Sequence, residues 1–149
     1  MMKSQTRFFI VIGFLILFLG IAFFIFSARN QEPTQVFQGT VNRDCAPWDG
    51  GAFTIKIPIS SAETIDISIW QTPQISSPSK FSFPDNTMQV GSAVLIHNTT
   101  PEIVVGEVWF EGVSEEEAVE GRFKLKSERG EEFAGRFVAE WDHQIVLCG

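Results

Sequence analysis

The residues of this 149-residue chain that are best suited to chemistry are carboxylates placed beside tryptophans. Glu107 and Glu111 flank Trp109, and a pair of carboxylates around a stacking ring would suit glycoside hydrolysis. Asp66 lies four residues before Trp70 in a second segment. Residues four apart on a strand, however, are roughly 13 Å apart, which is too far for either standard hydrolase geometry. The spacing therefore disfavours a glycosidase.

The same residues have a milder interpretation as a binding surface. Trp70 and Trp109 fall out of phase with the isoleucines and valines of their segments, so we expect both on the outer face of a sheet. If both are exposed, they form an aromatic platform for a sugar or a partner protein. The alternative is that each ring caps a sheet edge or lies under a loop. The candidate surface consists of Trp70, Trp109, Asp66, Glu107 and Glu111.

A second candidate is the loop that runs from Asp44 to Gly51. Asp44 and Asp49 offer oxygen ligands, and Trp48 between them offers a stacking face. Calcium takes six to eight oxygens, and the spacing does not match an EF-hand. A structural loop is the simpler interpretation, and we predict neither a metal site nor a cofactor.

Catalytic motifs are missing from the sequence. It contains no nucleophile elbow, zinc-binding histidine pair, phosphate loop or dinucleotide fingerprint. Its two histidines are His97, at the end of a predicted strand beside Asn98, and His143, in a predicted turn, and we expect both at the surface. We therefore predict that the protein is not an enzyme, and a small envelope hydrolase remains a distant alternative.

The two cysteines, Cys45 and Cys148, lie near opposite ends of the region that follows residue 35. A metal pair would need further ligands, and neither a C-x-x-C motif nor a histidine cluster is present. We predict a disulfide between them. In the chain-entropy model, closing a loop of about 100 residues stabilises a domain by up to about 4–5 kcal/mol.

The segments that must position these residues show apolar and polar residues with a period of two. Apolar and polar residues alternate from Phe53 to Ile59 and from Ile65 to Ile69, which predicts strands with one buried face. Pro58 cannot donate a ladder hydrogen bond, so its strand should lie at an edge or end there. Gly-Arg-Phe occurs at 121–123 and again at 135–137, which predicts the two arms of a hairpin.

The remaining segments complete an all-β prediction. Residues 71–91 are rich in serine and proline and are expected to form a long loop, and Ser114–Glu117 a solvated one. A last strand is expected at Gln144–Cys148. About 8–9 short strands favour an antiparallel β-sandwich, or a small barrel, over residues 36–149.

The N-terminal region differs from the rest of the chain. Phe8–Phe26 is a run of 19 residues without charge, which as a helix would span roughly 28 Å, close to the hydrocarbon thickness of a bilayer. We predict a transmembrane signal-anchor helix at 8–28, a cytoplasmic N-terminus at 1–7 and a linker at 29–35, because Lys3 and Arg7 precede the run. The alternative is secretion after signal cleavage near Ala22 or Ala28.

Charge restricts the partners further. The chain has a net charge of −7, and residues 30–149 hold eight basic against 18 acidic side chains, a net charge of −10. A nucleic-acid partner is disfavoured because it would require a basic footprint. We predict a single-pass, membrane-anchored, extracytoplasmic protein of the bacterial envelope that serves as a non-catalytic binding or assembly module. The first alternative is a carbohydrate-binding module that uses Trp70 and Trp109. We therefore expect a protein or a carbohydrate as the binding partner.

Overall fold

The computed structural model describes residues 35–149 apart from eight positions, which are Ser77, Asp85, Asn86, Met88, Gln89, Glu116, His143 and Gly149. The predicted cytoplasmic N-terminus and transmembrane helix, and the predicted linker up to residue 34, lie outside the described residues. Within the described part, no helix has the length and apolar character needed to cross a membrane.

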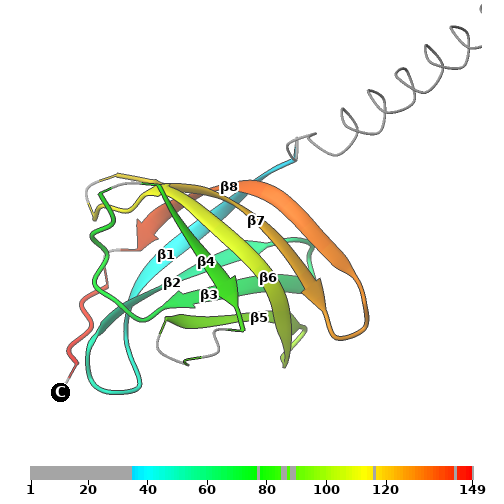
Figure 1. The fold of residues 1–149 in the computed structure, drawn as a ribbon, viewed down its shortest axis with the longest axis horizontal. Helices are drawn as coiled ribbons and strands as arrows, with labels where there is room; N and C mark the ends of the chain where they lie inside the picture. The colour runs from blue at the N-terminus through cyan, green and yellow to red at the C-terminus, as the bar shows by residue number, and fades with distance from the viewer. Residues whose placement is uncertain are drawn as a thin grey trace, which may run out of the picture. The chain divides into compact units, whose positions relative to one another are not determined.

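Eight strands form the described part of the chain, which confirms the all-β prediction (Figure 1). The alternation predicted from Ile65 to Ile69 falls within β3, and the one from Phe53 to Ile59 coincides with β2 except for Ile59, because one side of each strand faces a buried core. The strands are β1 (Val36–Cys45), β2 (Gly51–Pro58), β3 (Glu63–Ile69), β4 (Ser79–Phe83), β5 (Gly91–His97), β6 (Thr100–Gly112), β7 (Val119–Ser127) and β8 (Glu132–Asp142).

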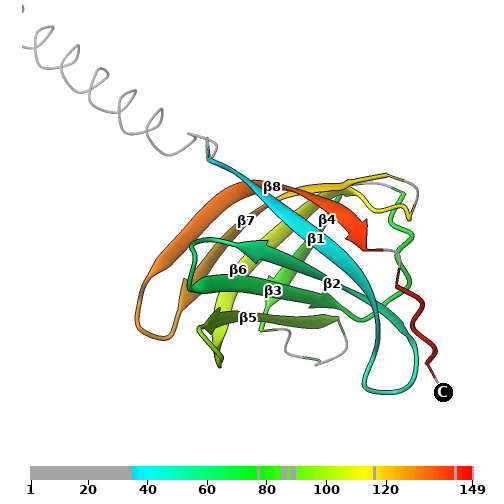
Figure 2. The same ribbon diagram turned by 180° about the vertical axis from the view of Figure 1, so that it is seen from behind.

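Seven of these strands close into a barrel in the order β6-β5-β3-β2-β1-β8-β7, and β7 pairs again with β6 (Figures 1 and 2). The preferred prediction of a sandwich is therefore wrong, and its alternative, a small barrel, is right. Closure depends on a parallel pair, since β1 lies beside β8 with Val36 opposite Arg136 and Asn42 opposite Asp142. All other neighbouring strands in the barrel are antiparallel.

Strand β4 is the eighth strand and lies outside the closed ring of seven. It pairs with the second half of β6, from Gly106 to Phe110, while β5 pairs with the first half. The prediction of an irregular loop over 71–91 was wrong for Ser79–Phe83. Phe83 is buried and Phe81 packs against the core, so the two rings fix this strand to the barrel.

The interior of the barrel is filled by side chains. Its largest fully buried members are four phenylalanines, and the isoleucines of β2 and β3 surround them. Phe110 contacts Phe53 and Phe137 edge-to-face, a favoured arrangement for aromatic rings. The four rings are those of Phe53, Phe110, Phe123 and Phe137.

Two details of the strand predictions have physical explanations. Pro58 is the last residue of β2, so the missing donor falls where the strand ends, although β2 itself lies between β1 and β3 and not at an edge. The predicted strand at Gln144–Cys148 is absent from the described residues, and this segment forms an irregular tail after β8.

Candidate functional site

The predicted disulfide between Cys45 and Cys148 is present, with a Cα–Cα distance of 5.6 Å. It joins the end of β1 to the tail. Asn42 and Asp142 are paired, yet three residues lead from Asn42 to Cys45 while six lead from Asp142 to Cys148. The tail therefore cannot continue the parallel ladder and must bulge away from β1.

Asp44, a predicted oxygen ligand, is already used by the fold. Its Oδ1 accepts a hydrogen bond of 2.8 Å from the N–H of Cys45, and its Oδ2 accepts one of 2.8 Å from the Thr54 hydroxyl. Thr54 Oγ1 also lies 2.8 Å from Ser68 Oγ on β3. The carboxylate thus ties the disulfide to β2 and β3, which makes it a structural group.

Trp48 stands on a tight turn between β1 and β2. The Ala46 N–H donates to the Gly50 carbonyl at 2.8 Å, and the Asp49 N–H donates to the Ala46 carbonyl at 3.0 Å. Asp49 adopts a φ of 62°, a left-handed conformation that aspartate tolerates better than most residues. The turn leaves the Trp48 side chain 53% exposed.

The two tryptophans of the predicted platform have different ring partners. Trp70 packs against Trp48 with ring centroids 5.7 Å apart and planes at 87°. Trp109 lies under the guanidinium of Arg122, whose Cζ is 5.1 Å from the ring centroid. Trp109 lies on the outer face of β6, because Val108 and Phe110 on either side of it are buried, whereas Trp70 follows the last residue of β3 and lies in no strand. Sequence periodicity could not show which ring lies beside which.

The acidic members of the predicted surface are also dispersed. Asp66 lies on β3 between Lys56 and Val94. Burial raises the pKa of its carboxyl, while the charge of Lys56 lowers it, and its Oδ1 has no hydrogen-bond partner among the described residues. Glu107 pairs with Lys80 at 2.7 Å on the outer face of β6.

Glu111 lies elsewhere, at a cleft of about 770 Å³ between the 73–76 segment and the β6–β7 connection. Arg43 forms an ion pair with Glu115 there, and the Trp141 indole N–H donates to the Ser114 carbonyl at 2.7 Å. The predicted solvated loop is therefore anchored to β1 and β8. Four glutamates line this cleft, namely Glu111, Glu115, Glu117 and Glu120.

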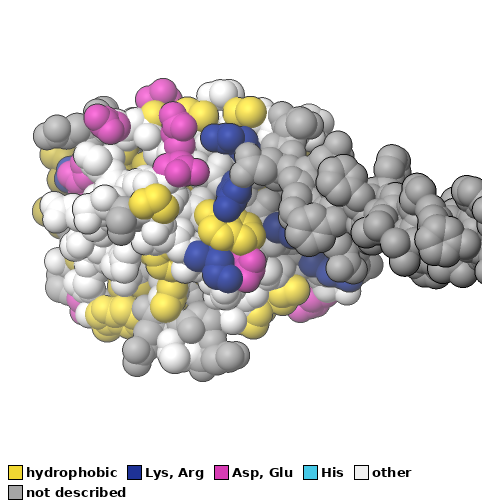
Figure 3. Space-filling view, turned by 45° about the horizontal axis from the view of Figure 1, so that its top comes forward, with side chains coloured by type: hydrophobic (Ala, Val, Ile, Leu, Met, Phe, Trp, Pro, Cys, Tyr) yellow, Lys and Arg dark blue, Asp and Glu magenta, His cyan; other side chains and the backbone are white. Residues whose placement is uncertain are grey.

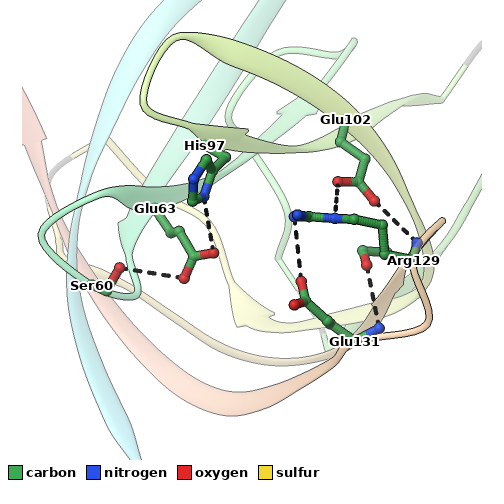
Figure 4. A network of polar contacts seen from close by, with 7 residues as sticks. Ser60, Glu63, His97, Glu102, Arg129 and Glu131 are labelled. Atoms are coloured by element: carbon green, nitrogen blue, oxygen red, sulfur yellow. Dashed lines mark hydrogen bonds and ion pairs between the residues drawn. The ribbon is translucent and has the colours of Figure 1, made fainter.

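The described histidine, His97, is the exposed last residue of β5 (Figure 4). Its Nδ1 lies 3.3 Å from Glu63 Oε1, and the Ser60 hydroxyl donates to Glu63 Oε2 at 3.3 Å. The carboxylate therefore stands between serine and histidine, whereas a nucleophile must contact its base directly. His143 lies outside the described residues.

The second cluster in Figure 4 is structural. Arg129 lies 3.0 Å from Glu102 and 3.4 Å from Glu131, which ties the β7–β8 turn to β6. Desolvation raises the pKa of Glu102, but the N–H and guanidinium of Arg129, with hydrogen bonds from Ser127 and Glu128, lower it overall. Among the residues that the structure describes, no group of three or more His, Cys, Asp or Glu could hold a metal ion.

Sequence reasoning missed an apolar surface around the disulfide, which we call the clamp surface. Ile145 is 83% and Leu147 88% exposed, and both lie in the tail that Cys148 fixes to Cys45. The sequence signal for this surface is the run Ile145–Leu147 directly before a cysteine, a segment for which the sequence predicts a strand. Among the residues that the structure describes, seven large hydrophobic side chains are exposed, and four of them form the clamp surface, which consists of Trp48, Ile145, Val146 and Leu147.

Comparison with family models, curated protein sequences and solved structures finds no match to this chain.

Proposed function

We propose that this protein is a non-catalytic, protein-binding module of the bacterial envelope, held at the membrane by its N-terminal apolar segment. The observation that carries the proposal is the clamp surface. Large apolar side chains that gather on an exposed surface are typical of protein interaction sites. The tail also lies outside every strand that the structure describes, so its apolar side chains do not contribute to the barrel core.

The disulfide explains how such a surface could bind well. A free tail would lose much conformational entropy on binding, whereas a tail fixed at both ends has lost part of it already. Trp48 adds a rigid aromatic anchor, the type of residue that often dominates binding energy. The partner therefore presents an apolar segment to Trp48, Ile145 and Leu147.

A protein partner fits this surface better than a sugar does. Sugars stack on flat, accessible ring faces, and the rings of Trp48 and Trp70 are nearly perpendicular. The face of Trp109 is partly occupied by Arg122. Carbohydrate binding remains the alternative outcome of the experiment.

Co-purification with matched variants tests the proposal. The full-length protein, extracted from its own membranes, is compared with the Ile145→Ser/Leu147→Ser variant and with Ile103→Ser, which removes an exposed isoleucine on β6. We expect one partner to accompany the wild type and Ile103→Ser and to be lost from the double variant. Equal recovery with all three proteins would contradict the proposal, and tryptophan fluorescence that responds only to glycans would favour the carbohydrate alternative.

A further inference from the structure

The tail that carries part of the clamp surface, Gln144–Cys148, is fixed to the barrel by the disulfide. Its described backbone groups make one hydrogen bond, from the Gln144 N–H to the Asp142 carbonyl at 2.8 Å. None of its side chains belongs to the core, and Ile145 and Leu147 are largely exposed. Figures 1 and 2 show the tail running outside the ring of strands. Breaking the disulfide would therefore release it.

The edge of β1 beside the tail lacks a strand partner. In the parallel pair of β1 and β8, the Arg136 N–H donates to the Gln35 carbonyl at 2.9 Å. Backbone groups alternate in direction along a strand, so odd-numbered residues of β1 and even-numbered residues of β8 present their N–H and C=O groups to each other. The pairing ends at Asp142, so Arg43 and Cys45 face no strand on this side among the described residues.

Substitute contacts occupy the place of the missing pairs. The Cys45 N–H, which would donate to a strand beside β1, donates instead to Asp44 Oδ1 at 2.8 Å. Gln144 is the next even-numbered residue after Asp142, and its N–H turns back to the Asp142 carbonyl. A continued ladder would instead let the Gln144 N–H donate to the Arg43 carbonyl, and the Gln144 carbonyl accept from the Cys45 N–H.

The disulfide prevents this continuation. The register of β1 and β8 would set residue 145 opposite Cys45, but the bond places Cys148 there, three residues later in the chain. A strand rises about 3.3 Å per residue, so the tail must fit six residues into the length of three. It bulges for that reason, and without the bond it could lie straight along β1.

A straight tail would also turn its apolar side chains away from solvent. Trp141 packs against the core, and side chains four and six residues further along a strand lie on the same face. Ile145 and Leu147 would therefore join the core side of β8, an arrangement that burial of apolar surface favours. The tail thus has two arrangements, and only the bulged one presents these side chains to a partner.

Acidic side chains lie close to the disulfide in the sequence. Asp44 precedes Cys45, Asp49 follows Trp48 in the turn, and Asp142 precedes the tail. Figure 3 shows Asp and Glu side chains gathered toward the end of the molecule at which Figure 1 draws the tail. Negative charge disfavours a thiolate, which is the reactive form in thiol–disulfide exchange. Small anionic thiols should therefore react slowly, so that each state persists until a protein dithiol or disulfide exchanges with it.

We propose that the Cys45–Cys148 disulfide is a redox switch that determines whether the clamp surface is presented. A thiolate of a protein dithiol attacks the Sγ of Cys148, which is the more exposed cysteine, and Cys45 leaves as a thiolate that takes up a proton. The second thiol then attacks the mixed disulfide and releases Cys148 as a thiol. Two electrons and two protons pass to the protein, the dithiol becomes a disulfide, and the freed tail pairs with β1.

Methyl NMR of the full-length protein in detergent micelles tests the switch. The isoleucine methyl groups are isotope-labelled, a soluble gadolinium chelate broadens the exposed ones, and thioredoxin with its reductase supplies the dithiol. In the oxidised protein we expect strong broadening of Ile145, assigned with Ile145→Val. On reduction this broadening should fall toward that of Ile65, which is buried on β3, while the exposed Ile103 stays broadened.

Two variants of Gln144 provide the matched comparison. Gln144→Pro has no N–H to donate to the Arg43 carbonyl, whereas Gln144→Ala keeps it. We expect Ile145 to remain broadened in Gln144→Pro after reduction, and to follow the wild type in Gln144→Ala. The inference rests on the proposed function for its consequence, which is that reduction of the wild type releases the co-purified partner.

The outcomes separate this inference from the proposed function. Broadening of Ile145 that reduction leaves unchanged would overturn the switch, and so would a Gln144→Pro variant that behaves as the wild type does. New broadening of Ile65 on reduction would show that the bond holds the barrel and not the tail alone, which also overturns it. Failure to find a partner by co-purification would contradict the proposed function alone, because the methyl measurement does not depend on a partner.

Discussion

Gly121 of β7 lies directly opposite Phe137 of β8, and the Phe137 ring fills the space that a side chain at position 121 would need. A Cβ at position 121 would lie 2.6 Å from Phe137 Cζ and would also meet the backbone carbonyl of Trp109. The second copy of the Gly-Arg-Phe repeat mirrors the first, with Gly135 opposite Phe123. Antiparallel pairing thus sets each glycine opposite the other copy's phenylalanine, but the ring that fills the space beside Gly121 is Phe137, whereas the ring beside Gly135 is Phe37 of β1.

Gly121→Ala is therefore expected to lower the free energy of unfolding by about 1–3 kcal/mol, the usual cost of overpacking a core. Gly112→Ala is the matched control, because its Cβ would meet only the Ile75 carbonyl at 3.3 Å. Denaturant unfolding of both variants measures the difference. If Gly121→Ala unfolds at the same denaturant concentration as the control, the space at position 121 is not filled as the structure indicates.

Loss of the disulfide is expected to destabilise the barrel by up to about 4–5 kcal/mol, because the bond closes most of the domain into one loop. Cys45→Ser/Cys148→Ser and the reduced wild type should unfold alike and well before the oxidised protein. An oxidised protein whose denaturant midpoint does not change on reduction would show that the bond contributes nothing to stability.

Trp48→Ala is expected to abolish partner binding with little effect on folding. Its ring is half exposed, and the contact with Trp70 contributes about 0.5–1.5 kcal/mol to the free energy of unfolding. Co-purification and denaturant unfolding on the same preparation separate the two effects. Binding lost in parallel with a large drop in stability would point to a structural role for Trp48.

Asp66→Asn is expected to raise the free energy of unfolding at neutral pH and to lose this advantage in acid. Burial raises the pKa of the Asp66 carboxyl above its unfolded value, and Lys56 opposes this only in part. The folded protein therefore holds the proton more tightly, so the wild type loses stability as the pH rises through the folded pKa. Below the unfolded pKa the Asp66 carboxyl is protonated in both the folded and the unfolded protein, so the cost of burying its charge vanishes.

Unfolding of the wild type and Asp66→Asn across this pH range measures the effect. A stability difference between the two proteins that is the same at every pH would show that the charge of Asp66 is not its source.

Local sequence carries much of this fold. The alternation of apolar and polar residues identifies β2 and β3, because each strand has one buried face. The two cysteines, which lie near opposite ends of one domain, predict the disulfide that joins them. Closure of the sheet depends instead on the pairing of β1 with β8, whose partner residues are 100 positions apart in the sequence. No local pattern encodes that pairing, so a sandwich and a barrel could not be distinguished.

The surfaces depend on the same long-range register. Lys80 and Arg122 are neighbours of Trp109 only because β4 and β7 both pair with β6. Trp70 contacts Trp48 because the turn between β1 and β2 approaches the end of β3. Periodicity predicts an outer face for Trp109 and Arg122, but it makes no assignment for Lys80 or Trp48, which fall in segments predicted as loops, and it cannot show which of these residues are neighbours.

Photocrosslinking from the tail tests the central claim most directly. A photoreactive amino acid replaces Leu147 of the clamp surface in the full-length protein, and Ile103 on β6 is replaced in the matched control. Both proteins are irradiated in intact cells. The account predicts one discrete adduct from position 147 that disappears with Trp48→Ala, and no such adduct from position 103. The same adducts from both positions, or none from position 147, would contradict it.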